Sequence, residues 1–265
     1  MDKTNELPVP LPEDDGSALV GARPEESREW VINTYRKHQQ VQTSSWLDNV
    51  LGEGSRDKKY VIPVLLDTNP IRHRQSIQEQ VFPAPRIIHE DLLITDHMKI
   101  MLEAGCGMGK TTFLKYYQER LLQQKPHPVY PLPVYFDLSC LSEGEGITRF
   151  MESVHQEMLR VVLAEGEEDP ELDLDEDLLL TTIKALEREG RILFLLDALD
   201  QLPVEDRFQV YLETFVEDKT FRSNRLILAT RKFSFGPLAT DSIIQRGKDA
   251  AFHATFERID ERERG

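Results

Sequence analysis

Short apolar runs alternate along the chain with longer segments whose apolar residues recur at helical spacing. The runs have the length and composition of strands, and the longer segments have the period of amphipathic helices. The predicted strands are 60–66, 99–103, 133–138, 191–196 and 225–229, and the predicted helices are 110–124, 147–164, 176–189 and 204–217. Strands separated by helices favour an α/β fold, in which helices cover a mainly parallel sheet.

The N-terminal part of the chain has a different pattern. Residues 1–23 are acidic and rich in proline, which predicts a disordered tail. Pro24 followed by two glutamates is typical of a helix start, and a second short helix is expected from Ser44 or Ser45. We therefore expect a small helical N-terminal region over 24–59 that ends in a linker.

A glycine-rich motif follows the predicted strand at 99–103. Residues 104–112 read Ala-Gly-Cys-Gly-Met-Gly-Lys-Thr-Thr, which has the spacing of a phosphate-binding loop between a strand and a helix. Its glycines let the backbone direct N–H groups at phosphate oxygens, and the helix start adds its positive end. Lys110 would contact the β- and γ-phosphates, and the Thr111 hydroxyl would hold Mg²⁺. The predicted nucleotide-binding residues of this loop are Gly105, Cys106, Gly107, Met108, Gly109, Lys110, Thr111 and Thr112.

An acidic motif ends another buried strand. The apolar residues 192–196 run directly into Asp197, Ala198, Leu199, Asp200 and Gln201. A carboxylate at the carboxyl end of a parallel strand lies where ligands bind in open α/β sheets, so Asp197 is the second candidate for supporting Mg²⁺. It could instead be a strand-end aspartate that caps a loop. Asp200 and Gln201 are the candidate catalytic residues. Asp200 could orient water or metal, or could be a helix cap, whereas the Gln201 amide could position water but is no general base.

The strand at 225–229 leads into Thr230 and Arg231. Thr230 and Arg231 could both face the γ-phosphate from this strand, because a guanidinium matches phosphate geometry, or Arg231 could be an ordinary surface arginine. In chain order, the complete strand at 133–138 lies between the phosphate-loop strand and the strand before Asp197. That order fits P-loop ATPases with an additional strand inserted beside the first better than it fits nucleotide kinases.

Together these segments resemble the NACHT group of STAND nucleoside triphosphatases, the switch ATPases of innate-immune receptors and their bacterial relatives. The resemblance covers about residues 60–235 and is carried by AGCGMGKTT, PLPVYFDLSCL, FLLDALDQL and ATR. These look like the family's phosphate loop, second strand, Walker B segment and sensor-1 strand end, and the small residue Ala198 is the more specific clue. The resemblance implies a switch that binds ATP or ADP with Mg²⁺, with GTP as the alternative base.

The chain departs from the family pattern at several points. Ala104 stands for the commoner first glycine, Gln201 for the second acidic residue, and Lys232 for a frequent proline. Hydrolysis is therefore expected to be slow or to depend on Asp200. The family's helical lid, winged helix and repeat sensor do not fit after residue 235. We accordingly expect a NACHT-like domain over 60–236 and a charged segment over 237–265 that is a truncated lid or a tail. Either the chain is a fragment, or a second copy or a partner protein would supply the lid or sensor, or the chain is a reduced relative of the family.

Composition limits the kinds of binding partner and the cellular compartment that we expect. The net charge of −15 argues against broad binding to nucleic acid or anionic membranes, and no apolar run is long enough to span a bilayer. The two cysteines, Cys106 and Cys140, are expected to be reduced in a cytoplasmic protein. The acidic stretch 165–177 departs from a calcium loop, because Leu178 and Lys184 stand where that loop needs Gly and Glu. It is expected to be a solvated loop.

Three functional interpretations remain open at this point. The first is an ATP-binding or GTP-binding switch with weak Mg²⁺-dependent hydrolysis in signalling or defence. The second is a scaffold or interaction protein whose nucleotide site is structural and does not turn over. The third, a P-loop kinase or small-molecule ATPase, would need a mobile arginine-bearing lid, and no such segment stands out in the sequence.

Overall fold

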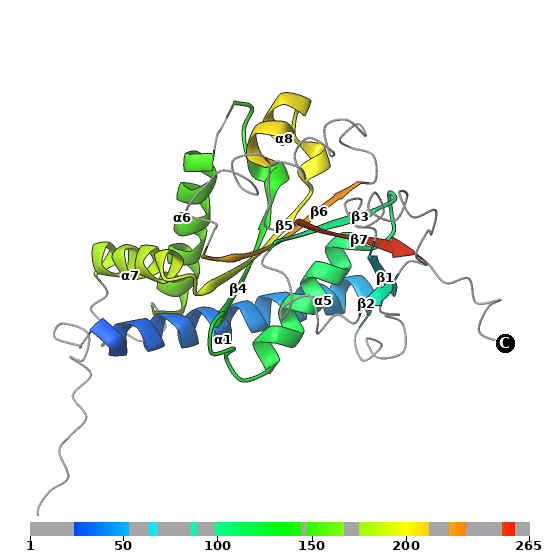
Figure 1. Ribbon diagram of the computed structural model, residues 1–265. Helices are drawn as coiled ribbons and strands as arrows, with labels where there is room; N and C mark the ends of the chain where they lie inside the picture. Colours follow the sequence, from blue (N-terminus) through cyan, green and yellow to red (C-terminus); the bar gives the residue numbers. More distant parts are fainter. Residues whose placement is uncertain are drawn as a thin grey trace, which may run out of the picture.

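The computed structural model describes residues 24–52, 64–67, 86–88, 99–144, 147–166, 175–211, 223–231 and 251–257. Its strands form one seven-stranded sheet in the order β2-β1-β7-β3-β6-β5-β4 (Figure 1). The strands are β1 (Val64–Asp67), β2 (Arg86–Ile88), β3 (Lys99–Ala104), β4 (Leu132–Asp137), β5 (Ile192–Asp197), β6 (Arg225–Arg231) and β7 (Ala251–Glu257). The segment from β7 to β4 is parallel, while β1 pairs antiparallel with β7 and β2 antiparallel with β1. The predicted α/β class is confirmed.

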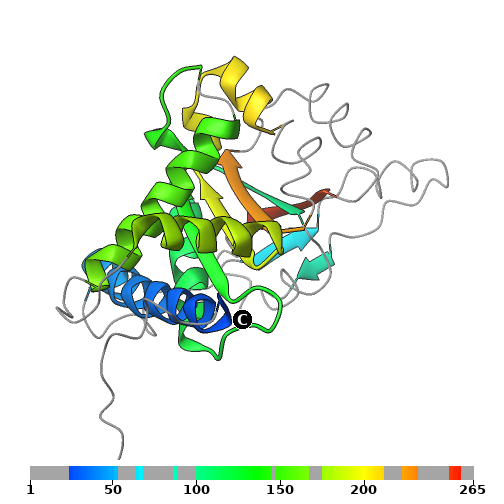
Figure 2. The same ribbon diagram turned by 90° about the vertical axis from the view of Figure 1, so that its left-hand side faces the viewer.

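Helices cover both faces of this sheet, as the alternation of elements predicts. The helices are α1 (Pro24–Leu51), α5 (Lys110–Gln123), α6 (Ile147–Gly166), α7 (Glu176–Arg188) and α8 (Val204–Tyr211), with short 3-10 turns η1 (Leu138–Cys140) and η2 (Leu199–Gln201). The last six residues of the predicted 204–217 helix lie outside the described residues. Figure 2 shows α6 and α7 in front of the central strands.

Alternation along the strands divides the core into two layers. On one face, residues such as Leu193, Leu195 and Ile227 pack against Phe113 and Tyr117 of α5. On the other face, α6 and α7 pack on the intervening strand residues, which are Leu132, Val134, Ile192, Phe194, Leu196, Leu226 and Leu228. Each central strand is therefore buried on both sides, which is why these strands read as continuous apolar runs in the sequence.

The position of the inserted strand is refined by the structure. The strand between β3 and β5 is β6, whereas the predicted 133–138 strand, β4, lies at the edge of the sheet. The other neighbour of β3 is β7, which lies inside the 237–265 segment that was expected to be a lid or tail. That expectation rested on the charged end of the segment. Residues 251–257 nevertheless alternate in the way that suits a strand, with Phe252, Ala254 and Phe256 at every second position.

One continuous helix, α1, spans the region where a break was expected at Ser44 or Ser45. Serine favours a helix start because its hydroxyl can cap free N–H groups, but it is also tolerated inside helices. Here the flanking residues Thr43 and Leu47 are both buried, so packing holds the helix together through this point. Helix α1 contacts α5, α6 and α7 and also β4, so it joins the helices of both faces beside the edge strand (Figure 1).

The predicted tail at 1–23 and most of the acidic stretch at 165–177 lie outside the described residues. Asp175, from that stretch, caps helix α7: its carboxylate accepts hydrogen bonds from the N–H groups of Asp177 and Leu178. No helix among the described residues is both long enough and apolar enough to cross a bilayer.

Candidate functional site

The glycine-rich motif forms a tight loop between β3 and α5, as predicted. Gly107 and Gly109 both have positive φ, at 71° and 87°, a conformation that glycine adopts without a Cβ penalty. Gly109 is the N-cap of α5, and its carbonyl accepts the first helical hydrogen bond, from the Phe113 N–H at 2.8 Å. The first N–H groups of the 14-residue helix therefore point into the loop, where an anion would be stabilised.

The Lys110 side chain binds the backbone at the start of this loop. Its ammonium donates hydrogen bonds to the carbonyl oxygens of Ala104 at 3.2 Å and Gly105 at 3.1 Å. Residues 105–107 are exposed, and Cys106 within them is a free thiol, as is the exposed Cys140. The loop thus presents backbone N–H groups and one lysine charge to the surface at the carboxyl end of β3.

Asp197 lies beside this loop and contacts Thr111. Its carboxylate accepts a hydrogen bond from the Thr111 hydroxyl, and Oδ1 accepts another from the Ala198 N–H at 2.8 Å. Asp197 is only 3% exposed. Burial raises the pKa of Asp197, while the hydrogen bonds from Thr111 and Ala198 act in the opposite direction. The structure therefore brings together the two residues that the sequence nominates for Mg²⁺.

The chain turns sharply immediately after Asp197. Ala198 has a φ of 60°, the one positive value for a non-glycine residue among those described. A large or branched side chain would be strained in this left-handed conformation. This explains physically why a small residue follows the aspartate in this motif.

Asp200 and Arg231 form an ion pair that joins η2 to the carboxyl end of β6. Arg231 Nε lies 2.7 Å from Asp200 Oδ2, and the Arg231 N–H donates to Asp200 Oδ1 at 3.2 Å. The Asp200 side chain is 6% exposed and that of Arg231 is 52% exposed. The two candidates are therefore joined to each other. Gln201, the third, is exposed in η2.

Thr230 does not join this group. Alternation along β6 places it on the α6 and α7 face with Leu226 and Leu228, opposite the face that packs against α5. Its hydroxyl is buried and has no hydrogen-bond partner among the described residues. The expectation that both ends of the Thr-Arg pair could face a γ-phosphate thus fails for Thr230.

The comparison with protein families agrees with this geometry. The family model of the NACHT domain matches residues 99–241, more than half of the chain. The chain belongs to the NACHT family. A search of the curated proteins gives no match. The NACHT match begins at β3 and includes the loop, Asp197, Asp200 and Arg231, while α1 and β7 lie outside it. As a NACHT domain, the chain is a nucleotide-binding P-loop NTPase.

The residues of this NACHT domain fit a magnesium ion. A hydroxyl and a carboxylate, from Thr111 and Asp197, are the hard oxygen donors that Mg²⁺ prefers. No group of three or more His, Cys, Asp or Glu side chains in the described part of the chain could hold a metal by itself. That is expected where the nucleotide's phosphates and water complete the coordination, because Mg²⁺ is commonly bound through few protein ligands. When bound, the ion would neutralise phosphate charge.

A lysine and a tyrosine that the sequence analysis missed complete the surroundings of Asp197. Tyr135 donates its hydroxyl to Asp197 Oδ2 at 3.3 Å, and Lys115 Nζ lies 3.5 Å from the centre of the Tyr135 ring. Burial lowers the pKa of Lys115 to about 8, although the negative charges of Asp197, Asp137 and Glu157 raise it. A signal was available for Tyr135 and Asp137, since both lie on the face of β4 that alternation directs toward α5.

Helix α1 is bound to the far end of the NACHT phosphate-loop helix. Arg36 donates to the carbonyl oxygens of Leu121, Leu122 and Gln124, at the end of α5, and to that of Pro131. A guanidinium at this position satisfies carbonyls that a helix end leaves without partners and complements the helix dipole. The contact joins segments more than 80 residues apart, so no local pattern could have predicted it.

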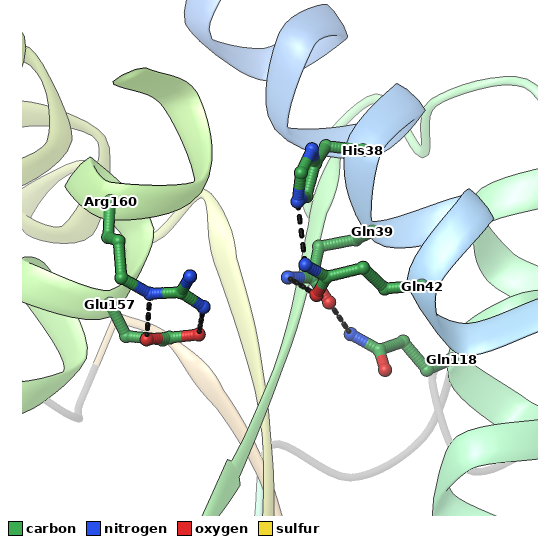
Figure 3. Close-up of polar contacts among 6 residues, drawn as sticks. All are labelled: His38, Gln39, Gln42, Gln118, Glu157 and Arg160. Carbon is green, nitrogen blue, oxygen red and sulfur yellow. Dashed lines mark hydrogen bonds and ion pairs between the residues drawn. The ribbon is translucent and has the colours of Figure 1, made fainter. Parts of the chain in front are cut away.

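A chain of glutamine amides, drawn in Figure 3, continues the α1–α5 contact, and the Thr43 hydroxyl adds to it. Gln118 of α5 accepts a hydrogen bond from Thr43 at 3.1 Å and donates to Gln39 at 3.5 Å and to the carbonyl of Pro133 at 3.1 Å. Gln39 in turn donates to Gln42, which contacts His38. In the same view, Glu157 and Arg160 form a separate ion pair on α6. The polar contacts fix how α1 lies on α5.

Proposed function

We propose that this NACHT chain is an ATP-binding switch with weak Mg²⁺-dependent hydrolysis that acts in cytoplasmic signalling or defence. The observation that supports it best is the convergence of Lys110, Thr111, Asp197 and Arg231 at the carboxyl ends of neighbouring parallel strands. Lys110 would bind the β- and γ-phosphates, Thr111 and Asp197 would hold the ion, and Arg231 would respond to the γ-phosphate. Two free cysteines suit a reducing compartment.

The Asp200–Arg231 ion pair supports slow hydrolysis. A γ-phosphate that attracts the Arg231 guanidinium competes with Asp200 for the same group, because both are anions that bind its donors. The carboxylate becomes available to orient water only when this pair opens. Gln201 offers an amide in place of a carboxylate and so cannot act as the base itself. Hydrolysis of the bound nucleotide would therefore be slow.

The exposed position of the loop favours an additional protein surface above the nucleotide. Residues 105–107 are exposed, and water at a phosphate weakens the electrostatic contribution of the surrounding groups. We propose that a second copy of the chain or a partner protein covers this site in the triphosphate state. Self-association that depends on ATP rather than ADP would be the consequence.

A scaffold with a structural nucleotide is the second candidate, and the same ion pair favours it. If Asp200 stays bound to Arg231, its carboxylate does not assist hydrolysis, and the nucleotide would remain in place without turnover. The two candidates make different predictions for the purified protein: both contain nucleotide, but only the switch releases phosphate.

The test begins with the nucleotide content of the purified chain, measured after denaturation, followed by phosphate release from Mg²⁺-ATP and Mg²⁺-GTP. We expect bound ADP and slow release of phosphate, with ATP preferred in competition. The Lys110→Ala variant should lose nucleotide binding in a calorimetric titration, since its ammonium is the charge inside the loop. Lys125→Ala, an exposed lysine beyond the far end of α5, is the matched control and should bind as the wild type does.

The outcomes separate the alternatives. Phosphate release that stays at the background level, with stoichiometric nucleotide retained, would favour the scaffold. Unchanged affinity in Lys110→Ala would refute the assignment of the loop. A wild-type protein that neither contains nor binds any nucleotide would refute both candidates.

A further inference from the structure

The Asp197 carboxylate receives a hydrogen bond from outside the two motifs. Ala198 follows it in the chain and Thr111 belongs to the phosphate loop, but the third donor, Tyr135, comes from β4. The parallel pairing of β4 with β5 places Tyr135 opposite Leu195 and Asp137 opposite Asp197. Because side chains alternate along a strand, Tyr135 and Asp137 project toward α5, where Asp197 also lies.

Tyr135 is held in this position from its ring face. Lys115 Nζ lies 3.5 Å from the ring centre, within the range of a cation–π contact. Lys115 comes four residues after Thr111 on α5, so the two side chains share one face of that helix. The ring therefore lies between a cation from α5 and the carboxylate of β5. These contacts restrict the ring and leave the hydroxyl directed at Asp197.

This arrangement has a consequence for the metal site. A carboxylate oxygen that is bonded to Tyr135 cannot turn freely, and the Thr111 hydroxyl bonds the same carboxylate. Oriented surroundings of this kind strengthen a metal site because the donors do not have to be ordered when the ion binds.

We propose that Tyr135, held by Lys115, is a positioning residue that fixes the Asp197 carboxylate beside Thr111 and so sets the magnesium requirement of nucleotide binding. This inference rests on the proposed function, since it concerns the same site. It goes beyond that function because it assigns a role to Tyr135 and predicts the magnesium dependence of nucleotide binding. Tyr135 contacts neither phosphate nor ion in this role and acts only through Asp197.

The test is the Tyr135→Phe variant, which removes one oxygen atom and keeps the ring over Lys115. Binding of a fluorescent ADP analogue is measured over a range of Mg²⁺ concentrations and in excess EDTA. We expect the Mg²⁺ concentration for half-maximal enhancement to rise about three- to fivefold, because a hydroxyl–carboxylate bond is lost that is long and therefore not among the strongest. Affinity in EDTA should equal that of the wild type.

Tyr130→Phe is the matched control. The Tyr130 ring also lies under a cation, with the Arg225 guanidinium 4.7 Å from its centre, but at the opposite ends of β4 and β6. This variant should keep the wild-type magnesium dependence. An unchanged magnesium titration in Tyr135→Phe would overturn the inference, and so would an equal loss of affinity with and without magnesium, which would show a merely structural role.

Failure of the proposed function gives a different result. If the wild type binds no ADP analogue under any condition, or if Lys110→Ala binds as well as the wild type, the nucleotide site itself is wrong. If the wild type binds and depends on magnesium while Tyr135→Phe matches it, only the role of Tyr135 is refuted. The EDTA measurement also reports that the variant is folded, because it needs an intact phosphate loop.

Discussion

The contact of α1 with the end of α5 gives the sharpest stability prediction for this protein. Arg36 is buried, and its guanidinium donates to the carbonyl oxygens of Pro131, Leu121, Leu122 and Gln124 at 2.6, 2.9, 2.9 and 2.7 Å. The change is Arg36→Met, which keeps an apolar side chain of similar reach and removes every donor. We expect a large loss in the free energy of unfolding with no change in fold.

The size of the loss in unfolding free energy depends on which of the four carbonyl groups can bind water instead of Arg36. The bonds to Pro131 and Leu122 are buried, whereas those to Leu121 and Gln124 are partly open and can be replaced by solvent. Two buried acceptors without partners cost about 1–3 kcal/mol each. Part of this is offset because the variant no longer buries a charge, a cost that also appears in the pKa of Arg36, which burial lowers. The net loss should be about 2–4 kcal/mol.

The assay is urea denaturation followed by circular dichroism, with Arg28→Met as the control. Arg28 also joins α1 to another helix, through a 2.7 Å ion pair with Glu189, but the two side chains are 37% and 41% exposed. Exposed pairs contribute at most about 1 kcal/mol. The reasoning is refuted if Arg36→Met loses no more stability than Arg28→Met at a similar denaturant slope.

The same variant separates stability from nucleotide binding. Helix α5 has 14 residues, so its two ends are about 20 Å apart at the usual rise per residue. Loss of the cap at one end should leave the loop at the other end intact, and folded Arg36→Met should bind ADP within about twofold of the wild type. A tenfold loss would mean that the two ends of α5 are coupled.

Two further predictions concern a tight turn and a partly buried lysine. Gly190→Ala should destabilise the fold by about 3 kcal/mol, because φ is +72° and an added Cβ would lie 2.5 Å from the Ser223 carbonyl oxygen. Gly144→Ala, at φ +80° with open space around it, should cost only about 1–2 kcal/mol, and equal losses in thermal denaturation would contradict the clash. Between pH 8 and 10 the wild type should gain about 2 kcal/mol relative to Lys115→Met, because the lowered pKa of about 8 means that the unfolded chain binds a proton there that the folded chain lacks. Parallel pH profiles of unfolding free energy would show that Lys115 is not desolvated.

The loop, the helix start and the strand ends of the candidate site were largely predictable because their pattern is local in the sequence. The spacing from Gly105 to Thr111 fixes a loop and a helix start, and an apolar run that ends in Asp197 fixes where that carboxylate emerges. What the sequence could not supply was the pairing of Asp200 with Arg231, since it depends on β5 and β6 being neighbours. From the sequence, Asp200 and Arg231 are separate candidates. In the structure they bind each other, so neither can act without opening the ion pair.

The errors at the two ends of the chain have different causes. The break expected near Ser44 came from a local capping preference that the burial of Leu47 outweighs. Strand β7 was missed because the charged residues after it dominated the interpretation, although Phe252 and Phe256 lie at alternating positions. In the second case the signal was present. In the first, only the packing of α1 on the rest of the molecule decides the outcome.

The packing of α1 also shows that a family match need not start where the core starts. The NACHT match begins at residue 99, yet Val31, Ile32 and Tyr35 of α1 belong to the same buried cluster as strands β4 and β5. Arg36 adds the bonds that end α5. A chain that began at β3 would expose this part of the core and leave the phosphate-loop helix without its cap. The helix is therefore physically part of the nucleotide-binding unit, because both the core beneath the sheet and the far end of α5 depend on it.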